Sequence, residues 1–391
     1  MDEPIIIRGT LLTPFETIPG GTVVVEGGKI IHVGGGDAEA SGRIYDFCDS
    51  FVAPGLIDLH THGGSGFDVM DASPEALDGV ARHLAAGGVT SFLSTTYSAP
   101  LDDLKAAARA VRASMERGTR GAEVLGLHLE GPYLNPARRG AQNPAHIRPP
   151  SIEELAEIVK EAGGAVRVVT LAPEIDGALE VAAWLASVGV TASAGHTDAT
   201  YEEMEAAVDA GVRHVAHLFN GMRPFHHRDP GVAGAALTDG RVTVELIADG
   251  VHLHPGALSL AAAAKGVGKT ALVSDSISPA GLPDGEYLFG GLRVRLRGGR
   301  CLLESGALAG STIRLCDAVR NMVELVGVPM AEAVEMASST PAAIIGVADR
   351  KGRLEPGMDA DLTVLDRDFS VLLTVVGGRV VHEAGADDDA R

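Results

Sequence analysis

The sequence predicts a (β/α)8 TIM barrel together with a smaller β-sandwich domain that both ends of the chain build. Three observations lead to this prediction. Short apolar runs alternate with helical patterns through the middle of the chain, and strand patterns broken by glycine-rich turns occupy both ends. In addition, histidines and carboxylates repeatedly follow the central apolar runs, as in a barrel whose site gathers at one mouth.

Eight apolar runs in the central region have the length and residue types of buried strands. A helical pattern follows each run, and eight such βα units match a closed barrel, with an open doubly wound sheet as the alternative. The predicted strands are 54–60, 89–95, 123–130, 166–172, 190–195, 213–219, 242–247 and 271–275.

Polar residues at the expected helix starts support this alternation. Ser73 before Pro74 provides an N-cap with proline at the first helical position. Ser151 and Thr200 are each followed three residues later by glutamate, which is the spacing of a capping box. An alternating apolar and polar pattern within 284–304 predicts a β-hairpin inserted before the last helix.

Both termini contain strand patterns, but neither end has enough strand to bury a sheet alone. We therefore expect residues 1–53 and 350–391 to form one small β-sandwich domain, and residues 54–349 to form the barrel. The last residues, 384–391, form a polar tail that we expect to be disordered.

The chain of 391 residues carries a formal net charge of −20, which disfavours binding to nucleic acid or to an anionic membrane. A local basic cluster can still bind a small anionic substrate. Three widely spaced cysteines predict reduced thiols and no disulfide framework. The first residues lack the pattern of a secretory signal, and no apolar run reaches the roughly 20 residues of a membrane span, so we expect a cytoplasmic protein.

Six residues with metal-binding side chains lie at or near the ends of predicted strands. The first two, His60 and His62, are spaced i, i+2, so both imidazoles point to the same face of their strand. Because the carboxyl ends of barrel strands meet at one mouth, we expect all six side chains to converge there. Imidazole and carboxylate ligands suit Zn²⁺ first and Fe²⁺ second. The six residues are His60, His62, Glu130, His196, His217 and Asp275.

The segment PGLIDLHTHGG (54–64) resembles the first-strand signature of the amidohydrolase superfamily. Further segments, in the same order along the chain, resemble the N-acetylglucosamine-6-phosphate deacetylases within that superfamily. Each motif is short, but the ordered set is specific and extends over nearly the whole chain. These segments are HLEGP (128–132), AGHT (194–197), HLFNGM (217–222), DGVH (249–252), VSD (273–275), LAGS (308–311) and PGMDADL (356–362).

The resemblance implies deacetylation of N-acetylglucosamine 6-phosphate with one or two divalent ions. Glu130, His196 and His217 match the ligands of the principal metal site. His60 and His62 match a second site that some members of the family fill and others have lost. Asp275 matches the catalytic carboxylate, which accepts a proton from the attacking water and passes it to the leaving nitrogen.

The resemblance also implies which residues hold the amino-sugar phosphate. Asn220 and the backbone of Gly221 match a turn that meets the phosphate, and Arg228 matches an arginine that reaches the phosphate across a homodimer interface. His252 matches a histidine that contacts the sugar. Gln142 stands in a lid where relatives usually carry histidine, and the choice between a glucosamine and a galactosamine substrate stays open.

Two other functions remain as alternatives. Dihydroorotase-like or aminoacylase-like amidohydrolases often use a carboxylated lysine at the end of the fourth strand, but residues 166–172 contain no lysine. A barrel retained only for binding typically loses a metal ligand or the catalytic acid, whereas this chain keeps them all. Deacetylation is therefore the favoured hypothesis.

Overall fold

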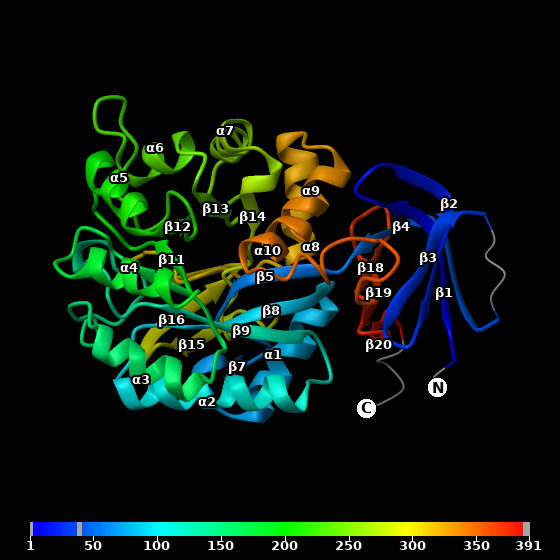
Figure 1. Cartoon of the computed structure of the whole chain (residues 1–391), viewed down its shortest axis with the longest axis horizontal. Helices are drawn as coiled ribbons and strands as arrows, with labels where there is room; N and C mark the ends of the chain where they lie inside the picture. The colour runs from blue at the N-terminus through cyan, green and yellow to red at the C-terminus, as the bar shows by residue number, and fades with distance from the viewer. Residues whose placement is uncertain (1–2, 37–40, 386–391) are drawn as a thin grey trace.

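A computed structural model describes residues 3–36 and 41–385. Two parts are distinct in Figure 1: a barrel of strands surrounded by helices and, beside it, a sheet to which both ends of the chain contribute. Residues 386–391 of the predicted disordered tail lie outside the described residues.

Eight parallel strands form the barrel that the sequence predicts. The first and last strands meet where Thr61 forms a parallel bridge with Ser276 and the Asp275 N–H donates to the His60 carbonyl at 2.8 Å. In their order around the barrel the strands are β5 (Leu56–Thr61), β8 (Val89–Thr96), β9 (Glu123–Glu130), β10 (Val166–Leu171), β11 (Thr191–Ala194), β12 (Val212–Val215), β13 (Thr243–Leu246) and β14 (Thr270–Leu272).

Helices follow the strands and cover the outside of the barrel (Figure 1). Ser73, Ser151 and Thr200 are N-caps as predicted, although the Glu154 carboxylate accepts from Arg148 at 2.8 Å and the Ser151 box is not reciprocal. The α-helices are α1 (Pro74–Ala86), α2 (Leu101–Arg117), α3 (Ile152–Ala162), α4 (Ala178–Ser187), α5 (Tyr201–Ala210), α6 (Gly231–Thr238), α7 (Pro255–Lys265), α8 (Leu315–Asn321), α9 (Met330–Met336) and α10 (Ser339–Ile344).

Shorter helical turns complete the helical elements. They are the 3-10 turns η1 (Val69–Asp71), η2 (Pro136–Arg138) and η3 (Val267–Lys269) and the π-helical turn η4 (Met322–Val326), which continues α8. Within residues 3–36 and 41–385, no helix combines the length and the apolar character needed to cross a membrane.

The barrel strands are buried on both faces, because helices cover the outside and side chains fill the interior. All residues of β5 and β8 are buried. Inside the barrel, Leu59, Leu93 and Val168 pack in one apolar cluster with Ala342 of α10 and the neighbouring Ile345. The interior is therefore a packed core rather than a pore.

Strands from both ends of the chain form one continuous sheet of seven strands. Its two halves share a core in which Ile7 and Val23 pack with Leu362 and Val375, so the predicted β-sandwich is one sheet folded over itself. In order across the sheet the strands are β20 (Arg379–Glu383), β19 (Val371–Val376), β18 (Leu362–Leu365), β4 (Arg43–Pro54), β1 (Ile5–Leu12), β2 (Thr17–Glu26) and β3 (Lys29–Gly35).

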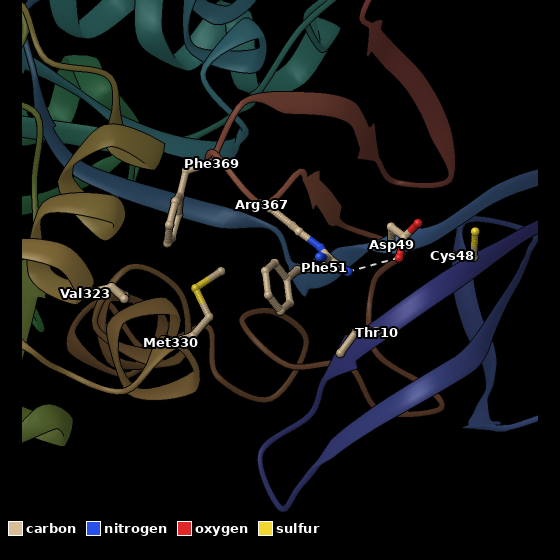
Figure 2. A pocket seen from close by; sticks show the side chains of 8 residues that line it. All are labelled: Thr10, Cys48, Asp49, Phe51, Val323, Met330, Arg367 and Phe369. Carbon is tan, nitrogen blue, oxygen red and sulfur yellow. Dashed lines mark hydrogen bonds and ion pairs between the residues drawn. The ribbon is translucent and has the colours of Figure 1, made fainter.

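A cleft of about 450 Å³ lies where this terminal sheet meets α9 of the barrel. Figure 2 shows Phe51 and Phe369 gathered around Met330, with Arg367 paired with Asp49 at 3.0 Å. None of the clusters of potential metal ligands found among the described residues lies in this cleft. We interpret this cleft as a gap left where the terminal sheet packs against the barrel.

The insertion predicted as a hairpin is a three-stranded antiparallel sheet, because residues 300–303 add a third strand. We call it the meander; its strands are β15 (Gly285–Phe289), β16 (Leu292–Arg297) and β17 (Arg300–Leu303). A small pair of strands, β6 (Gly63–Gly64) and β7 (Phe67–Asp68), follows β5 at the barrel mouth.

Candidate active site

The six residues predicted to form the metal site lie at the carboxyl-terminal mouth of the barrel. His60 lies within β5, His62 directly after it, and Glu130 ends β9. The other three lie two or three residues beyond their strands, so the expectation that the last of them ends strand β14 is wrong. These three are His196 after β11, His217 after β12 and Asp275 after β14.

Backbone strain marks the three residues beyond the strands. The φ angle is 48° at His196, 28° at His217 and 48° at Asp275. Non-glycine residues rarely adopt such values, and strained residues cluster at functional sites. Each left-handed residue turns the chain sharply where the strand ladder stops, and this turn directs the side chain into the mouth.

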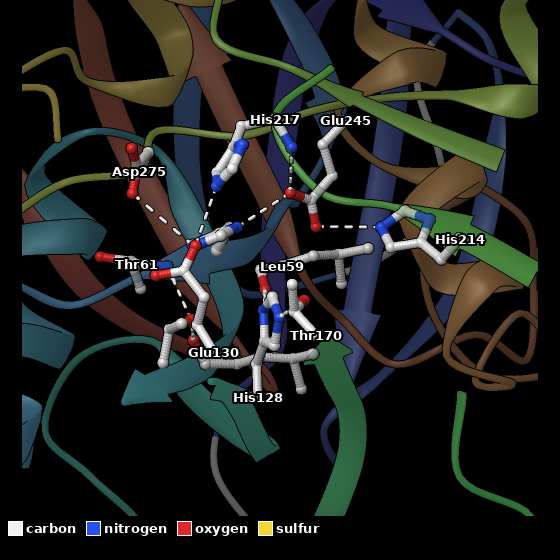
Figure 3. A network of polar contacts seen from close by, with 12 residues as sticks. Leu59, Thr61, His128, Glu130, Thr170, His214, His217, Glu245 and Asp275 are labelled. Carbon is white, nitrogen blue, oxygen red and sulfur yellow. Dashed lines mark hydrogen bonds and ion pairs between the residues drawn. The ribbon is translucent and has the colours of Figure 1, made fainter. Parts of the chain in front are cut away.

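Glu130 lies at the centre of the site. Its Oε1 is 2.9 Å from His217 Nε2, 3.1 Å from His196 Nε2 and 3.3 Å from His60 Nε2. The Nε2 atoms of His196 and His217 are 3.2 Å apart. Figure 3 shows Glu130 and His217 facing each other, with Asp275 beside them. Four separate elements thus bring potential ligand atoms to one point.

Asp275 faces the same space from the side of His62. Its Oδ1 is 3.2 Å from His62 Nε2 and 3.7 Å from His60 Nε2. Burial raises the pKa of Asp275, but the hydrogen bond from His62 and the charges of both histidines outweigh burial and lower the pKa overall. Asp275 is therefore an ionised carboxylate that can accept a proton.

Backbone carbonyls fix the orientation of two imidazoles. His62 Nδ1 lies 3.2 Å from the Thr95 carbonyl oxygen, and His196 Nδ1 lies 2.9 Å from that of Arg138. A carbonyl oxygen can only accept, so Nδ1 carries a hydrogen, and Nε2 is the nitrogen that each ring turns toward the site. Metal-ligating histidines show this arrangement.

Glu245 of β13 contacts two of the predicted metal ligands, a position that the sequence did not reveal. Its Oε2 lies 2.9 Å from His60 Nδ1 and accepts the His217 N–H at 3.0 Å, while Oε1 lies 2.9 Å from His214 Nε2 (Figure 3). Burial opposes ionisation of Glu245, but His60 and His214 hold its pKa well below the usual range. A lone carboxylate in the apolar run 242–247 is the signal that could have identified it.

His128 belongs to the barrel wall. Its ring nitrogens lie 3.1 Å from the Leu59 carbonyl oxygen and 2.8 Å from the Thr170 hydroxyl (Figure 3). Burial lowers the pKa of His128 to about 3. This neutral ring packs against His60, with the ring centroids 4.6 Å apart.

The donor set fits a bound cation. His60 Nε2 is buried without a hydrogen-bond partner among the described residues, although it faces two carboxylates. Two groups, His60 with Glu130 and His217, and His60 with His62 and Asp275, each have ligand atoms within 4.8 Å of one another. Ligands about 2.0–2.1 Å from a tetrahedral zinc ion lie about 3.3 Å apart. The spacings of 2.9–3.2 Å around Glu130 are close to this value.

A cavity of about 230 Å³ opens beside the cluster, and Asn220, Gly221, His252 and Gln142 all line it. His252 Nδ1 lies 2.7 Å from Asp249 Oδ2. Burial lowers the pKa of His252, but the hydrogen bond to Asp249 and its charge outweigh burial and raise the pKa overall. The imidazole is thereby favoured in its cationic form, which suits an anionic ligand.

Asn220 and Gly221 form the turn after His217. The Asn220 amide donates to the carbonyls of His217 at 3.1 Å and Leu218 at 3.2 Å. At Gly221, φ is +60° and a Cβ would lie 2.8 Å from His196 Nδ1. Glycine is therefore required both by the backbone conformation and by the close approach of His196.

Gln142 connects the predicted lid to Glu130. Its Nε2 donates to Glu130 Oε2 at 2.5 Å, and its Oε1 accepts the Ser98 N–H at 2.7 Å. The same segment supplies the Arg138 carbonyl that orients His196. The lid thus touches two of the predicted ligands directly.

Two further residues lie outside the lining of the cavity. Arg228 is exposed in the turn 226–229, with Nη1 2.8 Å from His227 Nε2, and it does not line the cavity. Glu174, to which the sequence analysis gave no role, accepts from the Thr197 hydroxyl at 2.5 Å and the Asp198 N–H at 2.6 Å. Glu174 therefore stabilises the loop that follows His196.

Comparisons with known proteins agree with this fold. Residues 51–381 match the amidohydrolase family, whose members are metal-dependent. The chain is 42% identical over 386 residues to the N-acetylglucosamine-6-phosphate deacetylase of Bacillus subtilis (strain 168), covering 97% of this chain and 98% of that protein. It is 44% identical over 329 residues to the N-acetylgalactosamine-6-phosphate deacetylase of Escherichia coli O157:H7, covering 84% and 87%.

Solved structures show the same architecture over almost the whole chain. One is a variant of the N-acetyl-D-glucosamine-6-phosphate deacetylase from Mycobacterium smegmatis in complex with N-acetyl-D-glucosamine-6-phosphate. It superposes with a TM-score of 0.92 and 33% identity, covering 97% of this chain and 99% of that chain. With its closed barrel, its clustered ligands and these matches, this chain belongs to the amidohydrolase family.

Proposed function

We propose that the protein hydrolyses the N-acetyl group of N-acetylglucosamine 6-phosphate, giving glucosamine 6-phosphate and acetate. The 42% identity to the Bacillus subtilis N-acetylglucosamine-6-phosphate deacetylase over nearly the full length supports this substrate. The galactosamine isomer is the second candidate, because the Escherichia coli relative that acts on it is 44% identical over a shorter region.

One observation carries the proposal: the carboxylate of Asp275 lies beside a convergent set of imidazoles and Glu130 at the mouth of the barrel. Amide hydrolysis needs an activated water, a polarised carbonyl and a proton for the leaving amine. This set of side chains can serve all three needs within one small cavity.

Glu130, His196 and His217 are the proposed ligands of a principal divalent ion, and His60 and His62 those of a second. Zn²⁺ is the first candidate and Fe²⁺ the second, because imidazole and carboxylate ligands suit both. A bound ion lowers the pKa of a water molecule and polarises the amide carbonyl.

Asp275 is the proposed catalytic carboxylate. Its Oδ1, held 3.2 Å from His62 Nε2, accepts a proton from the attacking water. The protonated carboxyl group then donates this proton to the sugar nitrogen as the C–N bond breaks, so that the amine leaves in neutral form. The backbone N–H of Asp275 donates a hydrogen bond to the His60 carbonyl, which holds Asp275 at the mouth of the barrel.

Asn220 and Gly221 are the proposed contacts for the phosphate, and His252 is the proposed contact for the sugar. Gln142 is proposed to bind the substrate from the lid. Arg228 is proposed to reach the phosphate in the site of a partner subunit, which requires a homodimer. Arg228 is exposed and is not among the residues that line this chain's own cavity, which supports a role in trans. A guanidinium fork matches phosphate geometry.

The remaining assignments belong to the same proposal. We infer a cytoplasmic enzyme without nucleic-acid or membrane partners, in line with the net charge of −20. The proposed domain boundaries are 1–53 with 350–391 for the terminal sheet and 54–349 for the barrel. Dihydroorotase-like and aminoacylase-like activities are disfavoured, because β10 offers no lysine to bridge two ions.

The test combines metal analysis with a deacetylation screen. Purified protein is analysed for zinc and iron per chain, and the same sample is assayed for acetate release from N-acetylglucosamine 6-phosphate and N-acetylgalactosamine 6-phosphate. We expect one or two ions per chain and release of acetate from the glucosamine compound. Metal-replete protein that binds these sugars but releases no acetate would make it a binding protein and end the proposal.

A further inference from the structure

One wall of the active-site cavity is apolar and comes from outside the strand ends. Phe289 of β15 and Ala141 of the lid line the cavity together with Ala307 and Leu308, which follow β17. Phe289 is 5% exposed and packs with Tyr97 in a small apolar cluster of its own. We call Phe289, Ala141 and Leu308 the apolar wall.

The apolar wall lies next to the reacting groups. The ring of Phe289 meets that of His62 edge to face, with centroids 5.5 Å apart. The Nε2 atom of the same histidine lies 3.2 Å from Asp275 Oδ1. A substrate group that contacts Phe289 is therefore close to the bond that breaks.

Polar lining residues occupy the other side of the mouth. Phe289 packs on Tyr97, which follows β8, with ring centroids 5.0 Å apart. Asn220 and Gly221 follow β12, which is four positions further around the eight-stranded barrel and therefore opposite β8. The cavity thus has an apolar side and a polar side across the cluster around Glu130.

The proposed substrate has the same asymmetry. On the nitrogen side of its amide lies a sugar with hydroxyl groups and a phosphate, and on the carbonyl side lies a methyl group. We propose that the apolar wall is the acyl-binding subsite, and that Phe289 limits the enzyme to short acyl groups. This inference rests on the proposed function. It adds that the acyl group of the substrate binds on the side of the cavity next to β8.

The tip of the meander is held in place from two directions. A Cβ at Gly290 would lie 3.6 Å from the Tyr97 ring, so the backbone packs directly on this side chain. The Gly290 carbonyl also accepts a long hydrogen bond of 3.5 Å from Asn143 of the lid. Because these two contacts fix Gly290, the neighbouring Phe289 should not move aside for a larger acyl group. A rigid apolar wall can therefore discriminate acyl groups by size.

The test compares metal-loaded wild type and Phe289→Ala on glucosamine 6-phosphates that carry N-acetyl, N-propionyl or N-butyryl groups. We expect the ratio of kcat/KM for N-propionyl over N-acetyl to rise at least about tenfold in Phe289→Ala, since one methylene in an apolar pocket changes discrimination by about 10–200-fold. The control Leu288→Ala changes the adjacent residue of β15, which is 67% exposed, and should leave the ratio unchanged.

An unchanged ratio in Phe289→Ala, with all acyl groups slowed equally, would overturn the inference and assign Phe289 to packing or to the sugar ring. If Phe289→Ala does not fold, Phe289→Leu makes the same comparison, and its ratio should rise by a smaller factor. Failure of the proposed function looks different: wild type would release no acyl group from any of the three compounds, and the inference would fall with it.

Discussion

The two carboxylates at the barrel mouth, Glu130 and Asp275, have different neighbours, and this difference separates their proposed roles. Glu130 Oε1 lies among the Nε2 atoms of His60, His196 and His217. Asp275 Oδ1 lies nearest to His62. Loss of the histidines should therefore remove a bound ion, whereas loss of the Asp275 carboxylate should remove proton transfer.

We expect Asp275→Asn to retain metal near the wild-type content and to lower kcat by about 10²–10⁴-fold, because an amide cannot accept the proton of the attacking water. His196→Ala should lose metal and activity together. Elemental analysis and turnover of the same preparations distinguish the two variants. If Asp275→Asn keeps most of its activity, the proton-transfer assignment is wrong.

Glu245 should control metal affinity without touching the ion. It binds His60 Nδ1 and the backbone N–H of His217, so Glu245→Gln should loosen the His60 imidazole and the His217 backbone and weaken metal binding by about 10–100-fold. Chelator competition with apo-protein measures this affinity. His214→Gln, which alters the contact to the other carboxylate oxygen, is the matched control and should have a smaller effect. Equal affinities in Glu245→Gln and wild type would contradict this role.

At the scale of elements, the predicted strands coincide with the observed ones, but two predicted ends extend too far. The predicted runs 213–219 and 271–275 continue past the ends of β12 at Val215 and β14 at Leu272. Their apolar pattern persists because Leu218 and Val273 are still buried. An apolar pattern in the sequence predicts burial. It does not predict where a strand ends, because the left-handed turns at His217 and Asp275 depend on contacts with neighbouring strands.

The turn at Gly221 offers a test of this local geometry. Gly221→Ala should weaken metal binding and lower activity at least tenfold, because its Cβ would displace His196 from a distance of 2.8 Å. The left-handed conformation alone costs about 1–2 kcal/mol for alanine. Gly20→Ala is the matched control, since Gly20 has the same φ of +60° with nothing within 4 Å. Metal affinity that is equal in both variants and wild type would show that the close approach is unimportant.

At the scale of the whole molecule, an ionic cluster around the buried side chain of Lys351 joins the terminal sheet to the barrel. Lys351, which is 2% exposed, binds Asp361 and lies 2.7 Å from Glu123 at the start of β9. Arg350 bridges Glu123 at 3.0 Å and Asp359 at 2.6 Å. The cluster lies at the end of β9 opposite to the active site, so its role is structural.

Lys351→Met should lower the free energy of unfolding by about 3–5 kcal/mol, because it leaves the buried carboxylate of Asp361 without its cation. Urea unfolding measures this change. Lys29→Met is the matched control: Lys29 binds Asp359 at 2.8 Å but its side chain is 50% exposed, so its loss should cost about 0–1 kcal/mol. A similar small cost in both variants would show that burial does not amplify the interaction.

Within this cluster, Glu123 should make the fold sensitive to acid. Burial raises the pKa of Glu123, but Lys351 and Arg350 outweigh it, so the pKa lies below the unfolded value of 4.5. This contribution to stability is complete above about pH 5 and is lost as the pH falls through the lower folded-state pKa. Unfolding measured from pH 7 to pH 3 should therefore show a shallower loss of stability in Glu123→Gln than in wild type. Parallel curves would contradict this assignment.

Sequence alone predicted the alternation of strands and helices, the joining of the two termini in one small domain and the strand ends where the candidate metal ligands lie. These features follow from burial patterns and local propensity, which each segment carries on its own. Glu245, the apolar wall and the lid contact of Gln142 could not be predicted in this way. Each depends on which side chain from another element comes within hydrogen-bond or van der Waals distance, and only the closed barrel decides those distances.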